Sequence, residues 1–235
     1  MERTGLSGAF VRAQARFVDW LIQRDLRRCF RAVYVRGARP DADRPLILFA
    51  NHHYWWDGYL GYWLIRSWRR RMLVWMESYR RFPPFHAVGA LPFPANNPQI
   101  RAHTVRRTVQ ALNREPAALL LFPEGALHGD TERLLPFQRS LHWLACRAPQ
   151  AMLLPLAIHI EPCYHQYPRA FLSVGAPFAS EATDASEWLA AAADALQNLL
   201  RQTRADARAG VDDAQHAAQG FQVLLRGARS IHERF

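Results

Sequence analysis

Residues 46–57 read LILFANHHYWWD, and this stretch decides the fold class. Its first part, Leu46 to Ala50, is an uninterrupted apolar run, which is typical of a β-strand buried on both faces. Three polar residues, Asn51 to His53, follow directly at the carboxyl end of this strand. Parallel sheets covered by helices bind their ligands at that end of the strands. The stretch therefore predicts an α/β fold with a candidate site just after Ala50.

On either side of this strand, apolar runs alternate with amphipathic segments. The alternation predicts a single α/β domain, a mixed and largely parallel sheet flanked by helices, with an N-terminal amphipathic helix. We expect this helix in residues 1–31, the main domain in residues 32–210 and a helical tail in residues 211–235. Further strands are predicted over 32–35, 72–76, 91–93, 117–122, 152–158 and 171–174, and helices over 8–31, 56–70, 98–114, 137–147, 185–208 and 214–229.

Composition narrows the class of protein. Half of the 235 residues are hydrophobic and 21% are charged, as in folded rather than disordered chains. The formal net charge of +10 favours polyanions such as anionic lipid headgroups, phosphorylated substrates or nucleic acid. Three scattered cysteines predict reduced thiols in a cytosolic compartment rather than a disulfide framework or a zinc site. We expect neither a signal peptide nor a membrane-spanning helix.

The predicted helix over residues 8–31 carries an apolar stripe with arginines between its members. Such a helix can lie in a membrane interface, with its apolar side down and its arginines toward anionic headgroups. It can equally dock on the core of its own protein and leave the arginines in solvent. The sequence supports both interpretations to the same degree.

The candidate site after Ala50 pairs a histidine with a carboxylate. Asp57 follows His52 by five positions, so the loop is long enough to fold back. The carboxylate can then accept a hydrogen bond from one ring nitrogen and leave the other nitrogen as a general base. Without a protein nucleophile, this pair suits direct attack by a hydroxyl or amine of a substrate. Many chains carry this spacing by chance, and His53 is not expected to be catalytic.

A second polar cluster, Pro123-Glu124-Gly125, follows the predicted strand over 117–122. A buried glutamate is costly unless it is paired or binds a ligand. Gly125 permits a positive φ or a close approach of substrate to the backbone. Taken alone, the cluster also fits an ordinary turn between a strand and a helix with a solvated carboxylate.

Together, Asn51-His52-x4-Asp57 and the block Phe122 to Gly125 resemble the glycerolipid acyltransferase superfamily, which includes glycerol-3-phosphate and lysophosphatidic acid acyltransferases. The resemblance covers about residues 33–160, and Leu154-Pro155-Leu156 is similar to a further block of the family. It implies the fold of these enzymes and the transfer of a fatty acyl group from a thioester to a hydroxyl of a lipid. The thioester, acyl-CoA or acyl carrier protein, is a co-substrate, and neither a cofactor nor a metal is expected.

The resemblance also implies roles for single residues. His52 takes the proton of the acceptor hydroxyl, and Asp57 orients His52. Glu124 and Gly125 belong to the acceptor-binding block, where Glu124 contacts the polar head of the acceptor, and Asn51 and Pro123 are expected to bind substrate beside them. The expected partners are a membrane lipid surface, the thioester donor and the lipid acceptor, without nucleic acid. The protein is expected to be peripheral, on the cytoplasmic face of the membrane.

Two arginines of the family pattern are absent. Ala-Leu-His occupies residues 126–128, where the family continues with Thr or Ser and then Arg, and the block over 89–95 has no arginine. Such arginines bind the phosphate of the acceptor. Their absence predicts that the acceptor is not a phosphate-bearing lipid bound in the usual pose, and a glycolipid or an amino-acid lipid is favoured instead. The helix over 98–114 offers three candidate replacements, Arg101, Arg106 and Arg107.

Three other functions compete with this interpretation. A family member that binds membranes or lipid without catalysis would explain the altered acceptor block. A basic nucleic-acid-binding protein would explain the net charge and the aromatic residues, although no recognisable motif is present. A metal-dependent hydrolase would use His52, His53 and Asp57 with other histidines, but the histidine spacings do not form a ligand set on one helix face. The other histidines considered are His86, His103, His128 and His142.

Overall fold

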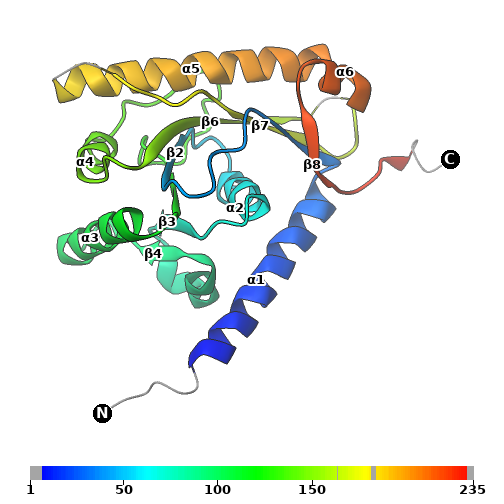
Figure 1. Cartoon of the computed structure of the whole chain (residues 1–235). Coiled ribbons are helices and arrows are strands. Elements are labelled where there is room, and N and C mark those ends of the chain that lie inside the picture. The colour runs from blue at the N-terminus through cyan, green and yellow to red at the C-terminus, as the bar shows by residue number, and fades with distance from the viewer. Residues whose placement is uncertain (1–6, 163, 181–183, 232–235) are drawn as a thin grey trace.

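The computed structural model describes residues 7–162, 164–180 and 184–231. Within these residues, one sheet of eight strands has helices on both of its faces (Figure 1). The strands are β1 Ala32–Arg36, β2 Leu46–Ala50, β3 Met72–Met76, β4 Ala90–Pro92, β5 Ala118–Leu121, β6 Met152–Glu161, β7 Arg169–Val174 and β8 Gln222–Arg226. The helices are α1 Ser7–Cys29, α2 Asp57–Ser67, α3 Pro98–Arg114, α4 Ser140–Arg147, α5 Ala185–Ala209 and α6 Asp213–Ala218, with two 3-10 helices, η1 Tyr79–Arg81 and η2 Pro83–Val88.

The strand order is β4-β3-β5-β2-β6-β7-β1-β8. Neighbours pair in parallel throughout, except for β6 with β7 and β1 with β8, which are antiparallel. The predicted α/β class with a mixed, largely parallel sheet is therefore confirmed. The centre of the sheet, where β2 lies between β5 and β6, brings the ends of β2 and β5 side by side.

Strand β2 shows why its sequence is apolar at every position. Leu46, Leu48 and Ala50 face the layer that contains α1 and α2. Ile47 and Phe49 face the opposite layer, which contains α4 and α5. All five side chains are completely buried. Burial of each large side chain contributes about 1.5–3 kcal/mol, so this strand anchors both layers.

Helix α1 docks on the protein with only one of its faces. Val18, Ile22 and Leu26 are buried in the layer shared with α2. Asp19 accepts a hydrogen bond from Tyr62 of α2 and forms an ion pair with Arg66. The N-terminal part of α1 extends away from the body of the molecule (Figure 1). Among the described helices, none is both long enough and apolar enough to cross a bilayer.

The predicted helix over residues 214–229 is wrong beyond Ala218. The chain turns at Gly220, which has φ +82°, and Phe221 is buried against Phe171 of β7. Residues 222–226 then form β8, which pairs antiparallel with β1. The reason is a tertiary contact: the edge of β1 offers backbone hydrogen-bonding groups, and residues 222–226 pair with them. An isolated short helix would be marginal in water and would leave several of its own backbone groups without a protein partner. The tail therefore completes the sheet.

Candidate active site

The loop after β2 is fixed by Asn51. Its side-chain amide donates to the carbonyl oxygen of Ile158 at 2.9 Å and accepts from the backbone N–H of Ile158 at 2.8 Å. The side chain is completely buried, so it ties the end of β2 to β6. Asn51 was expected to bind substrate, and the structure places it behind the site, among backbone groups.

His52 and Asp57 meet as their spacing predicted. His52 Nδ1 lies 3.2 Å from Asp57 Oδ2, which also accepts the backbone N–H of Tyr54 at 2.9 Å. Asp57 is the first residue of α2 and is completely buried. Burial raises the pKa of Asp57, and the hydrogen bonds from His52 and Tyr54 oppose that rise. An ionised Asp57 holds the proton of His52 on Nδ1, which leaves Nε2 unprotonated and able to accept a proton.

The ring of His52 is also held from the side. It stacks on Phe122 with the ring centroids 4.2 Å apart and an interplanar angle of 18°. Phe122 directly follows β5, so the two strand ends meet at this contact. The orientation of the His52 imidazole is therefore fixed by one hydrogen bond and one aromatic face.

Glu124 binds protein groups on both of its oxygens. Oε1 accepts the backbone N–H of His52 at 2.8 Å. Oε2 accepts the backbone N–H of Leu135 at 2.7 Å and lies 2.6 Å from Nε2 of His128. The residue is only 3% exposed, so these contacts offset the cost of its burial. In this arrangement the carboxylate holds the loop that carries His52.

The two residues beside Glu124 have different positions: Pro123 lies in the interior and Gly125 lies at the cavity. Pro123 is buried, and its carbonyl oxygen accepts the backbone N–H of Gln138 at 2.8 Å. Gly125 adopts φ +75° and lines the same cavity as His52. A Cβ atom at Gly125 would lie 3.2 Å from Cγ of Gln138, so glycine keeps this wall of the cavity open.

His53 turns away from the site into the protein. It is 5% exposed and meets His128 edge to face, with the ring centroids 4.7 Å apart. Burial lowers the pKa of His53 to about 4, and the nearby carboxylate of Glu124 opposes this change. The two adjacent histidines therefore have different environments, with His52 at the cavity and His53 in the interior.

A cavity of about 900 Å³ opens beside His52. One part is apolar and lies over β3, β5 and η2, where Met72, Val74, Leu120 and Phe85 form its walls. A polar part lies near the strand ends and includes two arginines, Arg101 of α3 and Arg139 just before α4, together with Glu77, Ser78, Gln138 and Ser140. The volume is at the upper end of the range for small-molecule sites.

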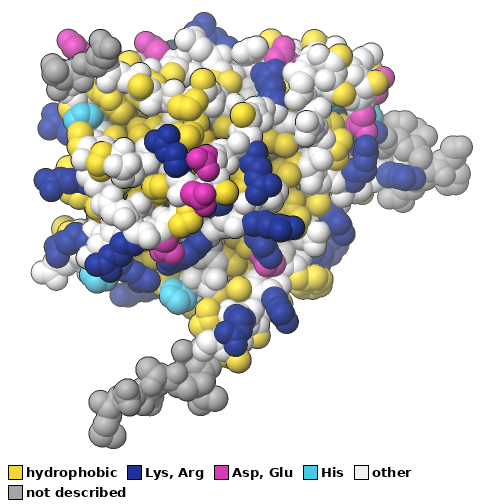
Figure 2. All heavy atoms as spheres, in the orientation of Figure 1, with side chains coloured by type: hydrophobic (Ala, Val, Ile, Leu, Met, Phe, Trp, Pro, Cys, Tyr) yellow, Lys and Arg dark blue, Asp and Glu magenta, His cyan; other side chains and the backbone are white. Residues whose placement is uncertain are grey.

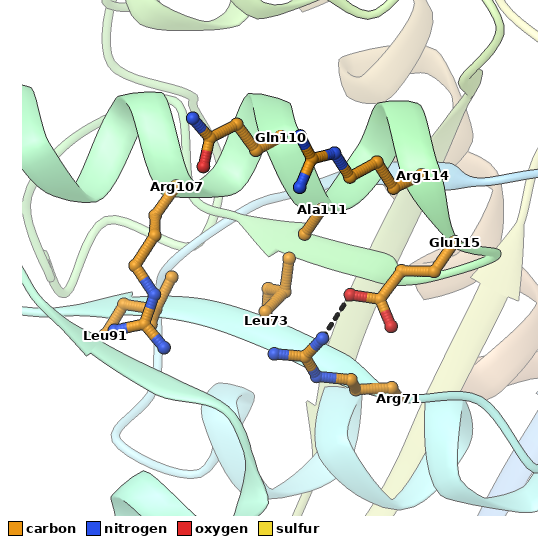
Figure 3. Close-up of a pocket in the computed structure, with 8 residues that line it drawn as sticks. All are labelled: Arg71, Leu73, Leu91, Arg107, Gln110, Ala111, Arg114 and Glu115. Carbon is orange, nitrogen blue, oxygen red and sulfur yellow. Dashed lines mark hydrogen bonds and ion pairs between the residues drawn. The ribbon is translucent and has the colours of Figure 1, made fainter.

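Of the three arginines proposed as replacements, Arg101 lines this cavity and lies over the ring of Phe93 at 4.7 Å. Arg107 instead lines a separate hollow of about 190 Å³ with Arg114, Leu73 and Leu91 (Figure 3). Arg106 lines neither of these two spaces. Sequence reasoning missed Arg139, because it lies far from the recognised blocks.

Comparison with known proteins agrees with this architecture. Residues 31–165 match the family described as Acyltransferase. The crystal structure of the 1-acyl-sn-glycerophosphate (LPA) acyltransferase PlsC from Thermotoga maritima is similar, with a TM-score of 0.54 and 18% identity over 83% of this chain and 80% of that chain. At this identity the similarity concerns the fold. No curated protein matches the chain. Because the family match spans more than half of the sequence, the protein belongs to the Acyltransferase family.

Proposed function

We propose that the protein transfers a fatty acyl group from a thioester donor, acyl-CoA or acyl carrier protein, to a hydroxyl group of a lipid acceptor. The observation that carries the proposal is the His52–Asp57 pair at the wall of a large, partly apolar cavity. A buried carboxylate that orients an imidazole is the arrangement required of a general base.

The reaction needs no nucleophile from the protein. Nε2 of His52 accepts the proton of the acceptor hydroxyl while its oxygen attacks the thioester carbonyl carbon. The tetrahedral intermediate collapses by breaking the C–S bond, and the departing thiolate takes the proton from His52. Asp57 stabilises the imidazolium between these two steps. Acceptor and donor leave as an ester and a thiol, and the histidine returns to its initial state.

The apolar part of the cavity is suited to the acyl chain. Its walls come from α2, β3, β5 and η2, and they supply apolar side chains to the same cavity that His52 lines. An acyl chain bound there is removed from water, which is worth about 0.8 kcal/mol for each buried methylene. The thioester carbonyl then lies at the polar end of the cavity, beside the base.

The polar part of the cavity is suited to the acceptor headgroup. The family arginines are absent, which favours a glycolipid or an amino-acid lipid over the usual phosphate pose. Arg101 and Arg139 nevertheless place positive charge at this end. A carboxylate of an amino-acid lipid, or a phosphate held differently, would find a partner there.

Arg101→Ala is expected to lower kcat/KM about tenfold for an acceptor with an acidic headgroup, mainly by raising KM. The reason is the loss of one charge-assisted hydrogen bond, which contributes about 1.5–3 kcal/mol before solvent screening. The assay follows transfer to acidic and neutral acceptors separately. Arg107→Ala is the matched control, since this arginine is on the same helix but lines the separate hollow (Figure 3). Equal losses for both variants would contradict an acceptor role of Arg101.

We further propose that the protein works as a peripheral protein on the cytoplasmic face of a membrane. The exposed fractions of Phe10, Phe17 and Trp20 on α1 are 63%, 50% and 52%. Trp55 and Leu127 are also exposed and belong to the lining of the cavity. Figure 2 shows basic side chains interspersed with hydrophobic ones over the visible face, the exposed part of α1 included. This combination suits an interface with anionic lipids.

Replacement of Phe17 and Trp20 by serine is expected to lower binding to vesicles that contain anionic lipid by about tenfold or more, because two partly exposed aromatic anchors are lost. Co-sedimentation with vesicles measures the change. Trp143→Ser is the control, because Trp143 is an exposed aromatic of α4, in the layer on the other face of the sheet. Unchanged binding of the double variant would assign the membrane contact to another surface.

The proposed activity is tested by transfer of a radiolabelled palmitoyl group from coenzyme A or acyl carrier protein to a panel of acceptors. The panel contains lysophospholipids, glycolipids and amino-acid lipids with a free hydroxyl. Transfer to one class, dependent on His52, supports the proposal and identifies the acceptor. Binding to vesicles without transfer to any acceptor would favour a lipid-binding protein that lacks catalysis.

A further inference from the structure

A cluster of His53, Glu124 and His128 lies behind the loop that carries His52. One nitrogen or oxygen from each of the three side chains lies within 4.8 Å of the other two. His53 and Glu124 are buried, and the side chain of His128 is 15% exposed. These three residues do not line the cavity that contains His52. The cluster is therefore a place distinct from the substrate space.

Each of the two histidine rings has one buried nitrogen without a hydrogen-bond partner among the described residues. His53 Nε2 and His128 Nδ1 are both buried and make no hydrogen bond within the described part of the chain. Buried polar atoms in proteins are nearly always paired, so two such nitrogens in adjacent rings call for an explanation. Glu124 Oε2 lies 2.6 Å from the other nitrogen of His128, Nε2, so this ring turns one nitrogen to the carboxylate and leaves the other unpaired. One possible donor atom from each imidazole and from the carboxylate lies within 4.8 Å of the other two.

This donor set matches the coordination chemistry of zinc. Zn²⁺ binds imidazole nitrogen and carboxylate oxygen at about 2.0–2.2 Å, which places tetrahedral ligand atoms about 3.3 Å apart. That separation lies between the shortest contact, 2.6 Å, and the 4.8 Å limit of the cluster, so small side-chain rotations suffice. Ca²⁺ and Mg²⁺ prefer sites made of oxygen alone and are not favoured here.

We propose that His53, Glu124 and His128 bind a divalent transition-metal ion of the zinc type. The ion joins the loop after β2, which supplies His53, to the loop after β5, which supplies Glu124 and His128. Histidine spacing along one helix did not reveal this site, because its ligands come from two loops that the parallel sheet brings together.

The position of the site assigns the ion a structural task. Glu124 accepts the backbone N–H of His52 at 2.8 Å, and the backbone N–H of His128 donates to the carbonyl oxygen of His52 at 3.2 Å. Two of the three ligand residues therefore hold the backbone N–H and the backbone C=O of His52. Because its ligands lie outside the cavity, the ion does not reach the thioester carbonyl, and it acts on catalysis through the position of His52.

The test is metal binding by the full chain after treatment with a chelator, independent of any activity. Titration with Zn²⁺ is followed by calorimetry and titration with Co²⁺ by visible absorption. We expect one equivalent per chain, together with a higher Tm, since an ion that binds only the folded state stabilises it. His53→Ala and His128→Ala are each expected to weaken binding about 100-fold.

Two controls make the result specific. His142 and Cys146 form an exposed pair on α4, with 3.7 Å between Nε2 and Sγ, and this pair can bind zinc on its own. All proteins therefore carry Cys146→Ala. His103→Ala removes an exposed histidine of α3 and should bind like its parent. Circular dichroism verifies folding, and His53→Gln or His128→Gln replaces the alanine variant at the same position if that variant does not fold.

Two results would overturn the proposal. One is the failure of the folded parent protein to bind either ion. The other is binding by folded His53 and His128 variants with the affinity of the His103 control. Neither result depends on acyl transfer, so both are distinct from a failure of the proposed activity.

Discussion

Replacing His52 by alanine is expected to lower kcat for acyl transfer by about 10²–10⁴-fold, because the acceptor hydroxyl then loses its only positioned base. The imidazole is fixed by Asp57 at 3.2 Å and by the face of Phe122, so water is a poor substitute for it. The measurement is transfer of a radiolabelled acyl group at saturating donor, with vesicle binding recorded on the same samples.

Two further variants sharpen this result. Asp57→Asn keeps the volume of the side chain but presents an amide N–H₂ or a weaker acceptor to Nδ1, so we expect a loss of comparable order through the wrong tautomer. His86→Ala is the control, since this histidine is exposed on η2. Retention of transfer in both the His52 and Asp57 variants would remove the proposed mechanism, whereas retained vesicle binding shows that the fold survives.

Glu124→Gln is expected to lower both stability and activity, although Glu124 does not touch the substrate in the proposed mechanism. The carboxylate accepts three hydrogen bonds, from His52, Leu135 and His128. The glutamine amide has only one oxygen, so its NH₂ group takes the place of the other carboxylate oxygen. That NH₂ group then faces a hydrogen-bond donor, and at least one buried N–H loses its acceptor. The cost is about 1–3 kcal/mol, which corresponds to a fall in Tm of about 2–12 °C for a chain of this size.

Thermal unfolding with a chelator present separates this loss from any effect of bound metal. If Glu124 positions His52, kcat falls while KM for the acceptor changes little. If Glu124 instead binds the acceptor head, as the family resemblance implies, KM rises and stability changes little. Glu132→Gln is a suitable control, because Glu132 forms an ion pair with Arg204 while its side chain stays 65% exposed.

Much of the fold could be predicted because its strands are locally distinct. Strands β2 and β3 and helix α3 have the predicted bounds. The strands are recognisable because burial on both faces leaves no polar residue inside such a strand. Strand β8 could not be predicted in this way. Its residues Gln222 to Arg226 are mostly exposed, and the strand with which they pair, β1, is distant in the sequence.

The site shows the same division. The contact of His52 with Asp57 is local and followed from a spacing of five residues. The contacts of Glu124 and Asn51 run to backbone groups on other strands, and sequence does not specify them. The sequence indicated His128 as a departure from the family pattern and as one of several histidines of a metal-dependent alternative, but not as a partner of Glu124. Its pairing with Glu124 required the turn after β5 to be known.

The position of β1 constrains the order in which the chain can fold during synthesis. This strand is made early, yet its two neighbours are β7, which starts at Arg169, and β8, which starts at Gln222. At about 5–20 residues per second, the ribosome needs on the order of ten seconds to supply the first of them. Over that interval the hydrogen-bonding edges of β1 stay available to other chains, a known route to aggregation. The backbone groups of β1 therefore wait for strands that are synthesised much later than β1 itself.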